Sequence, residues 1–406
     1  MRILCLTSRL PYPPNRGDRL RAFHFIEHLA REHELSLASF IAHEGERQHL
    51  AALEALCRTV QVVPMSPRSS AAAVARNVWR REPLQALYYR SRAMGRLVAQ
   101  LTASTRFDAA YIHLFRMAPY LAGYRDLYRV VDLTDVISKE IDLSLPYRGL
   151  ASRLLYRLEK PRIARYEQWV ARTFEESWLI SEADRRLLLA ACPGANVRVV
   201  PNGVDMEMFR PLEGTPVPNR LIFVGHLRVF HNVDAARYLV GEILPLVRRQ
   251  VPGCTAEIAG ASPDPSVQAL AETPGVSVPG FVEDLNQALN QASVFVAPLR
   301  FAAGVQNKVL EAMAAGRPVV TTGAIADGLG AVPGRDLLTG EDAPALAGEI
   351  VRLLGDAELQ TALGQAGRQF VQEKYGWHYA VERMGAIEEM LKSGRTQETY
   401  RPRDGA

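Results

Sequence analysis

The sequence predicts an α/β fold in which two doubly wound domains face each other across a cleft. The chain has 406 residues, enough for two or three domains. Short apolar runs alternate with helical patterns, so the strands need crossovers and form mainly parallel sheets. The pattern stops at a turn containing proline, asparagine and glycine, residues 201–205, and then begins again. Two such halves place a cleft at the carboxyl ends of their strands.

In the first domain, residues 1–200, each short apolar run indicates a buried strand. The predicted strands are 2–6, 34–41, 59–63, 109–113, 129–133, 177–180 and 197–200. Apolar residues at helical spacing predict the helices 20–30, 48–57 and 150–174. Residues 201–220 contain several prolines and are predicted to link the two domains.

The same alternation defines the second domain, residues 221–372. Its predicted strands are 221–224, 255–259, 276–278, 293–299 and 318–322. Its predicted helices are 234–250, 305–315, 346–354 and 359–373. The last residues, 393–406, are polar, and we expect them to be disordered.

Composition limits the kind of protein. The four cysteines lie far apart without a C-x-x-C pair, so we expect buried thiols in a reducing compartment rather than a zinc site or disulfides. No signal peptide and no membrane-spanning stretch is expected, which favours a cytoplasmic location. The net charge of +4 and the lack of a recognition motif argue against nucleic-acid binding.

One stretch is unusually basic. Residues 68–106 contain eight arginines and one acidic residue, Glu82, with apolar and aromatic side chains between them. A basic helix of this composition can lie on anionic lipid headgroups at the inner face of the cytoplasmic membrane. The alternative is an ordinary solvated helical face.

The residues with the clearest chemistry lie between a predicted strand and the next helix. Gly304, Lys308 and Glu311 are spaced by four and three residues, so they share one face of the helix 305–315. The free N–H groups at a helix start bind phosphate, and Gly304 permits close approach of the backbone. Lys308 can neutralise a diphosphate, and Glu311 can accept hydrogen bonds from ribose hydroxyls. The alternative is an ordinary crossover with a surface lysine and glutamate.

The segment 294–320 resembles the donor-binding signature of the retaining family 4 glycosyltransferases, whose GT-B fold has two Rossmann-like domains. Its sequence is most similar to that of the sugar transferases of exopolysaccharide gene clusters of the PEP-CTERM/EpsH type. Further segments that resemble motifs of these transferases occur at residues 12–19, 131–136, 181–184, 201–205, 223–225 and 231–235. The resemblance covers nearly the whole chain, from about residue 1 to about residue 390.

The resemblance implies a role for particular residues. His113 contacts the transferred sugar, and Glu311 is the second member of the family's Glu-x7-Glu pair. The donor-binding set is Gly17, Gly225, Arg228, Gly304, Val305, Gln306, Asn307, Lys308 and Glu311. Residues 373–392, around Trp377, form a helix that crosses back to the first domain. Outside the resemblance, Gly17 is a turn glycine, His113 a structural histidine, Arg228 a surface arginine and Trp377 a packing residue.

One departure concerns the donor sugar. The first glutamate of the pair falls at Ala303, which leaves Gln306, Asn307 and the backbone amides around Gly304 as candidates to hold the sugar hydroxyls. His226 and His231 stand near the positions where the family has an arginine and a lysine, so Lys308 and Arg228 are the candidates for the phosphate contacts.

The expected reaction moves a sugar from a UDP- or GDP-sugar to a glycan or polyprenyl-linked acceptor in exopolysaccharide synthesis. The resemblance implies retention of configuration. No Asp-x-Asp motif occurs in the cleft-facing segments, so we expect no metal and no cofactor besides the donor. Two alternatives remain on this fold: a nucleotide-sugar 2-epimerase and a non-catalytic nucleotide-sugar-binding scaffold. A dinucleotide oxidoreductase is disfavoured because no G-x-G-x-x-G follows Leu6 or Val224.

Overall fold

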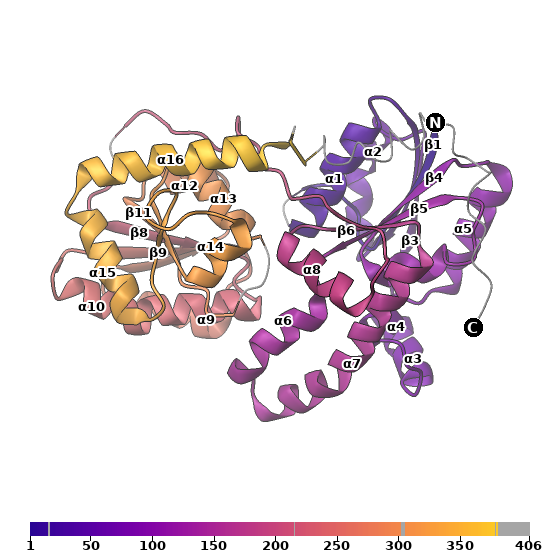
Figure 1. Ribbon diagram of the computed structural model, residues 1–406, viewed down its shortest axis with the longest axis horizontal. Coiled ribbons are helices and arrows are strands. Elements are labelled where there is room, and N and C mark those ends of the chain that lie inside the picture. Colours follow the sequence, from indigo (N-terminus) through magenta and orange to yellow (C-terminus); the bar gives the residue numbers. More distant parts are fainter. Residues whose placement is uncertain (15–16, 215, 302–304, 378, 381–406) are drawn as a thin grey trace.

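The computed structural model describes residues 1–14, 17–214, 216–301, 305–377 and 379–380. Each domain is built on one sheet in which every strand pair is parallel (Figure 1). The first sheet has the order β3-β2-β1-β4-β5-β6-β7, and the second has β10-β9-β8-β11-β12-β13. The prediction of two doubly wound α/β domains is confirmed.

The first sheet is covered by helices on both faces. Its strands are β1 Arg2–Thr7, β2 Glu34–Ile41, β3 Thr59–Pro64, β4 Ala109–His113, β5 Tyr128–Thr134, β6 Glu176–Leu179 and β7 Val197–Val199. Its helices are α1 Gly17–Leu29, α2 Leu50–Glu54, α3 Pro67–Asn77, α4 Leu84–Tyr88, α5 Arg92–Ser104, α6 Ile137–Ser144, α7 Leu150–Thr173 and α8 Glu182–Ala191. Leu4 and Leu6 of β1 belong to one core cluster and Ile3 and Cys5 to another. Because side chains alternate along a strand, these clusters lie on opposite faces of the sheet.

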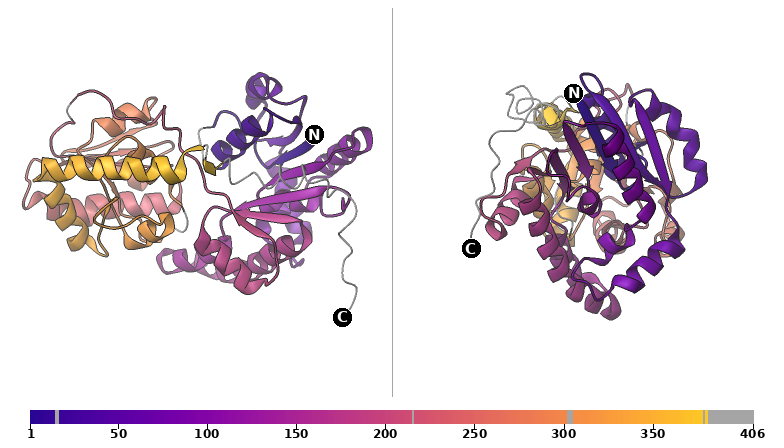
Figure 2. Two further views of the ribbon diagram at one scale, coloured as in Figure 1. Left: turned by 45° about the horizontal axis from the view of Figure 1, so that its top comes forward. Right: turned by 90° about the vertical axis from the view of Figure 1, so that its right-hand side faces the viewer.

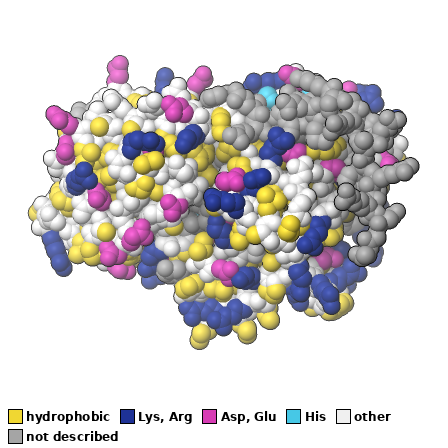
Figure 3. Space-filling view, viewed as in Figure 1, with side chains coloured by type: hydrophobic (Ala, Val, Ile, Leu, Met, Phe, Trp, Pro, Cys, Tyr) yellow, Lys and Arg dark blue, Asp and Glu magenta, His cyan; other side chains and the backbone are white. Residues whose placement is uncertain are grey.

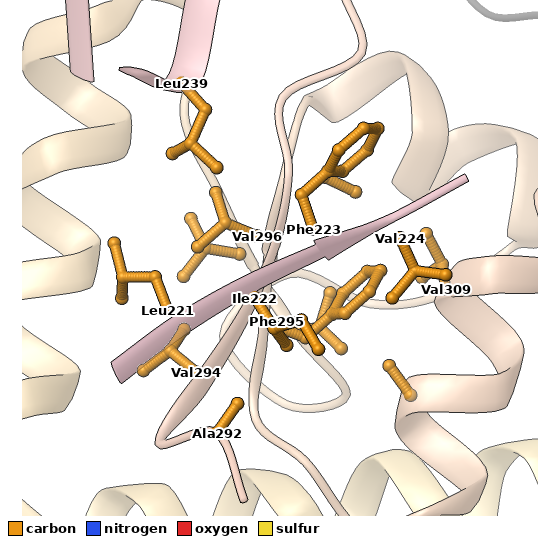
Figure 4. Close-up of a cluster of buried hydrophobic side chains, with 14 of the residues drawn as sticks. Leu221, Ile222, Phe223, Val224, Leu239, Ala292, Val294, Phe295, Val296 and Val309 are labelled. Atoms are coloured by element: carbon orange, nitrogen blue, oxygen red, sulfur yellow. The ribbon is translucent and has the colours of Figure 1, made fainter. Parts of the chain in front are cut away.

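The second domain repeats this construction around a central strand. Its strands are β8 Arg220–Val224, β9 Thr255–Ala259, β10 Val276–Gly280, β11 Val294–Ala297, β12 Val319–Thr321 and β13 Leu338–Thr339. Its helices are α9 Phe230–Tyr238, α10 Leu244–Arg248, α11 Pro265–Gln268, α12 Leu285–Asn290, α13 Asn307–Ala314, α14 Gly323–Leu329, α15 Ala343–Leu354 and α16 Ala357–Tyr375. Figure 4 shows β8 at the centre of the core, with Ile222 beside Phe295 of β11 and Val224 beside Val309 of α13, while Phe223 points to the opposite face of the sheet. The apolar runs of both strands are therefore buried, as expected for a parallel sheet.

Three helical expectations need correction. The helix expected at 234–250 is divided into α9, a π-helical segment Leu239–Ile243 and α10, which has a proline in its first turn. The helix expected at 48–57 begins as a 3-10 segment, Glu44–His49. The basic stretch 68–106 forms three helices, α3 to α5, and its Leu87 and Tyr89 are buried in the core. Charge density alone does not reveal which residues of such a stretch face inward.

The chain also connects the domains near its end. Figure 2 shows α16 running along the second domain and ending at the first. There the N–H of Val204 donates to the carbonyl of Tyr375 at 2.7 Å, and the ring of Trp377 lies 4.1 Å from that of His24 on α1. Gly203 makes this approach possible, because a Cβ at this position would lie 2.2 Å from the Trp377 ring. Of the crossing helix expected at 373–392, residue 378 and everything beyond residue 380 lie outside the described residues.

The structure also bears on the cysteines and on the search for membrane-spanning segments. Cys5, Cys57, Cys192 and Cys254 are all buried free thiols, as predicted. None of the helices in the described ranges combines the length and the apolar character that a membrane crossing requires.

Candidate active site

Two helix N-termini meet where the domains face each other. α1 begins at Gly17 in the first domain, and α13 begins at Asn307 in the second. A Cβ on Gly17 would lie 3.7 Å from Nδ2 of Asn307. Both helix starts offer free backbone N–H groups and partial positive charge, so this junction attracts an anion from both sides.

Lys308 of α13 is held in a fixed position. Its Nζ donates to Oδ1 of Asn232 on α9 and, at 3.4 Å, to Oε1 of Gln306. It also lies 5.7 Å from the centroid of the Phe223 ring. Burial lowers the pKa of Lys308 to about 8, although the nearby Glu311 carboxylate acts in the opposite direction. A bound diphosphate would restore the proton affinity of this amine.

Glu311 lies one turn further along α13. Its side chain is half-buried and accepts no hydrogen bond from any residue that the structure describes. Burial raises the pKa of Glu311 to about 7, and the charge of Lys308 only partly opposes this shift. A half-buried carboxylate without donors needs them from elsewhere, and vicinal hydroxyls of a ribose supply two.

A glycine is required at position 225 because Asn232, the residue that positions Lys308, packs against it. A Cβ on Gly225, directly after β8, would lie 2.8 Å from the side-chain amide of Asn232. Asn232 is buried and its Nδ2 donates to the carbonyl of His226 at 3.1 Å. Gly225 therefore leaves room for the amide that binds Lys308. Sequence reasoning did not assign a role to Asn232, and its only signal was its place in the run 231–235.

Arg228 is in a different environment. Its side chain is exposed, and its charge helps lower the pKa of Asp264 after the larger effect of the hydrogen bonds from Ser266. His231 of α9 lies near two cationic side chains, those of Lys308 and Arg148. Burial lowers the pKa of His231 to about 3, with further contributions from the charges of Lys308 and Arg148. Arg148 comes from the first domain, so cationic groups of both domains approach this site.

The remaining members of the loop differ in their surroundings. Val305 is buried in the core of the second domain and supplies packing with its side chain. Asn307 accepts a hydrogen bond of 2.9 Å from Nδ2 of Asn202. Gly304 and Ala303 lie outside the described residues.

His113 ends β4 inside a buried polar network. Its Nδ1 lies 3.1 Å from the hydroxyl of Tyr111 and 3.5 Å from Oδ2 of Asp132. The Tyr111 hydroxyl donates to Asp132 at 2.9 Å, so its oxygen is left to accept from Nδ1–H of His113. Nε2 of His113 is buried without a partner among the described residues. This tautomer makes Nε2 an acceptor for a hydroxyl group of a ligand.

The same network reaches α13. Nε of Arg21, on α1, donates to Oδ2 of Asp132 at 2.6 Å, and its Nη1 donates to Oδ1 of Asn202 at 3.0 Å. Asn202 lies in the connection between the domains and donates to Asn307. A continuous path of side chains thus joins the His113 end of the first sheet to the start of α13. Arg21, Asp132 and Asn202 were not assigned roles from the sequence.

The described residues contain no group of three or more His, Cys, Asp or Glu side chains placed to hold a metal ion. The candidate site consists instead of helix N-termini, the Lys308 amine, the Glu311 carboxylate and the His113 imidazole.

The chain is similar to known proteins in sequence and in fold. Residues 218–356 match the family model described as "Glycosyl transferases group 1". The MMP α-(1→4)-mannosyltransferase of Mycolicibacterium hassiacum is 29% identical over 252 residues, which are 57% of this chain and 59% of that protein. The chain thus matches less than two thirds of the length of this curated relative.

Two solved structures share the whole architecture. Sucrose-phosphate synthase from Thermosynechococcus elongatus has a TM-score of 0.69 at 16% identity, covering 97% of this chain and 100% of that one. Anabaena HepE in complex with UDP-glucose has a TM-score of 0.65 at 15% identity, with the same coverage. The predicted GT-B arrangement of two Rossmann-like domains is therefore confirmed. The matches thus give the whole chain a GT-B fold and place the similarity to group 1 glycosyl transferases in its second domain.

Proposed function

We propose that the protein transfers a sugar from a nucleoside-diphosphate sugar to a glycan acceptor bound in the cleft. The observation that carries this proposal is the pair on α13. Lys308 is fixed by Asn232 beside a helix N-terminus, and Glu311, one turn away, has no hydrogen-bond donor among the described residues. A cation beside free N–H groups suits a diphosphate, and the carboxylate suits the ribose.

Each group then has a defined task. When the bond between sugar and diphosphate breaks, negative charge grows on the leaving phosphate. Lys308 and the N–H groups at the start of α13 stabilise that charge, which lowers the barrier. Nε2 of His113 accepts a hydrogen bond from a hydroxyl of the transferred sugar and so orients the sugar. The facing N-termini of α1 and α13 hold the donor between the domains, where water is restricted.

We further propose a UDP- or GDP-sugar as donor, transfer with retention and independence of metal ions. The solved structure of HepE holds UDP-glucose, which supports a uridine donor on this fold. The resemblance to exopolysaccharide-associated transferases supports a lipid-linked glycan as the acceptor. The basic stretch 68–106 supports contact with a membrane surface, but only part of it is exposed.

The test measures nucleotide release from UDP-, GDP- and dTDP-sugars, with and without lipid-linked acceptors and with a chelator. Glu311→Ala should weaken donor binding by about 2 kcal/mol, roughly 30-fold, because two hydrogen bonds to a charged acceptor are lost, and Glu311→Gln, which keeps one neutral acceptor oxygen, should weaken it less. Glu358→Gln on the exposed start of α16 is the control and should change nothing.

The outcomes separate the candidate functions. Acceptor-stimulated release that survives chelation and falls in the Glu311 variants supports the proposal. Release of free sugar or of an epimer without any acceptor would indicate a 2-epimerase. Donor binding without turnover on every acceptor would indicate a scaffold, and no binding of any nucleotide sugar would refute the proposal.

A further inference from the structure

The first part of α7 presents apolar side chains that no described residue covers. α7 has 24 residues, and its buried residues begin only at Glu159. Leu150, Leu154 and Leu158 are 83%, 64% and 61% exposed. Their spacing of four residues places them in a row on one side of the helix, opposite the side that packs.

Neighbouring segments extend this row. Nη2 of Arg162 on α7 donates to the carbonyl of Val78 at 3.1 Å, which holds the end of α3 against α7. Trp79, the next residue, is 73% exposed. Seven of the 14 large hydrophobic side chains that are exposed in the described chain lie in this region. They form what we call the α7 surface: Val78, Trp79, Leu143, Leu150, Leu154, Leu155 and Leu158. Such concentration marks an interaction site rather than scattered surface residues.

The α7 surface is surrounded by positive charge. Exposed arginines without an acidic partner in the described ranges flank it: Arg76, Arg81, Arg157 and Arg165. Three acidic residues nearby have cationic partners, since Asp142 pairs with Lys160 at 2.7 Å, the buried Glu159 with Arg162 at 3.0 Å and Glu82 with Arg90 at 2.9 Å. Figure 3 shows hydrophobic and basic side chains together along the lower edge, where Figure 1 places α7 and α3.

This corner of the first domain also borders the cleft. Arg148, just before α7, stacks over the ring of Phe230 at 4.8 Å, and Phe230 begins α9 of the second domain. Arg148 also contributes to the lowered pKa of His231, after the effect of burial and together with Lys308. Whatever covers the α7 surface therefore lies beside the entrance to the candidate active site.

We propose that the α7 surface docks the protein on an anionic lipid bilayer. Leucine and tryptophan side chains enter the boundary between headgroups and acyl chains, and the flanking arginines bind the anionic headgroups. A covering protein surface would need acidic side chains to match the arginines, whereas a bilayer supplies both the charge and the apolar layer. The purpose of docking rests on the proposed function, because it brings the cleft to a lipid-linked acceptor.

The experiment compares sedimentation with vesicles of phosphatidylcholine alone and with added phosphatidylglycerol. The protein should bind the anionic vesicles, and Leu154→Glu/Leu158→Glu should bind them about tenfold more weakly. The control Leu187→Glu changes a leucine on α8 that is 44% exposed and outside the α7 surface, so binding should be unchanged. Tryptophan fluorescence should shift to the blue on anionic vesicles, and Trp79→Phe should abolish the shift.

Three results would overturn the proposal: no binding of the unaltered protein to anionic vesicles, equal binding by the double leucine variant, or a solution dimer that the double variant dissociates without any vesicle binding. The last result would assign the surface to a second copy of the chain. Nucleotide release with a soluble acceptor, measured on the same proteins, should not respond to the leucine substitutions. Vesicle binding without any nucleotide release would therefore count against the proposed function and leave the docking surface in place.

Discussion

The Arg21–Asp132 ion pair lies inside the first domain, and Asp132→Asn tests its contribution. The two side chains are 1% and 0% exposed, and Nε of Arg21 donates to Oδ2 of Asp132 at 2.6 Å. The substitution keeps the size of the side chain but leaves the guanidinium without its counter-charge. Removing one member of a buried pair costs about 3–5 kcal/mol, so we expect a loss of that size in the free energy of unfolding at pH 7.

The dependence on pH identifies the cause. Burial by itself would raise the pKa of Asp132, but the charge of Arg21 and the hydrogen bond from His113 hold it well below its usual range. A carboxyl whose pKa is lower in the folded state stabilises fully above its unfolded pKa, about 3.9. The stabilisation is lost as the pH falls toward the folded value. The difference between the protein and Asp132→Asn should therefore be largest at pH 7 and shrink below pH 4.

Urea unfolding followed by tryptophan fluorescence measures this difference, since Trp178 is fully buried in the same domain. Glu34→Gln is the control. Glu34 pairs with Arg2 at 3.5 Å and Arg58 at 2.7 Å, all with substantial exposure, so its loss should cost less than about 1 kcal/mol. A loss below about 1 kcal/mol for Asp132→Asn would refute the buried-pair reasoning. An equal loss at pH 7 and at pH 3 would show that packing, rather than charge, is responsible.

Three further predictions concern the candidate site. Gly225→Ala should weaken nucleotide-sugar binding about tenfold in calorimetry, because the new methyl group displaces the Asn232 amide that holds Lys308. The control Gly348→Ala has no atom near its Cβ position and should leave binding unchanged. His113→Ala should lower kcat more than donor affinity, and a loss in affinity alone would contradict its contact with the transferred sugar. Donor affinity should rise as Glu311 ionises near pH 7 and fall above pH 8 as Lys308 loses its proton, and Glu311→Gln should remove only the acidic limb.

The fold could be predicted because its signals are local. Strands buried on both faces of a parallel sheet read as short continuous apolar runs, and the run Leu221 to Val224 became β8. The face of α13 that carries Lys308 and Glu311 follows from helical spacing alone. The strand β13 escaped notice because two residues carry no periodicity.

The polar network could not be predicted because its partners are far apart in sequence. Arg21 is 111 residues from Asp132 and 181 from Asn202, and no local pattern connects them. From the sequence alone, an arginine such as Arg21 in an amphipathic helix is predicted to lie on the surface. Only the folded structure shows that a carboxylate lies opposite it. Asn232 is similar, since only the position of Lys308, 76 residues away, gives its amide a role.

Backbone strain offers an independent argument for the same edge of the first sheet. Leu114 has a φ of 72° and follows His113, and Thr134, with a φ of 71°, lies two residues after Asp132. Neither residue is a glycine, and a β-branched threonine is among the least suited to positive φ. The surrounding structure holds both in place, since Leu114 N–H donates to the carbonyl of Asp132 at 2.8 Å and the carbonyl of Thr134 accepts from Ile180 N–H at 2.9 Å. Strain persists only where neighbouring contacts enforce it, and it gathers where geometry serves a ligand. These two strained turns coincide with the strand ends that carry His113 and Asp132, so the local preferences of the chain are overridden where the candidate site requires a fixed imidazole.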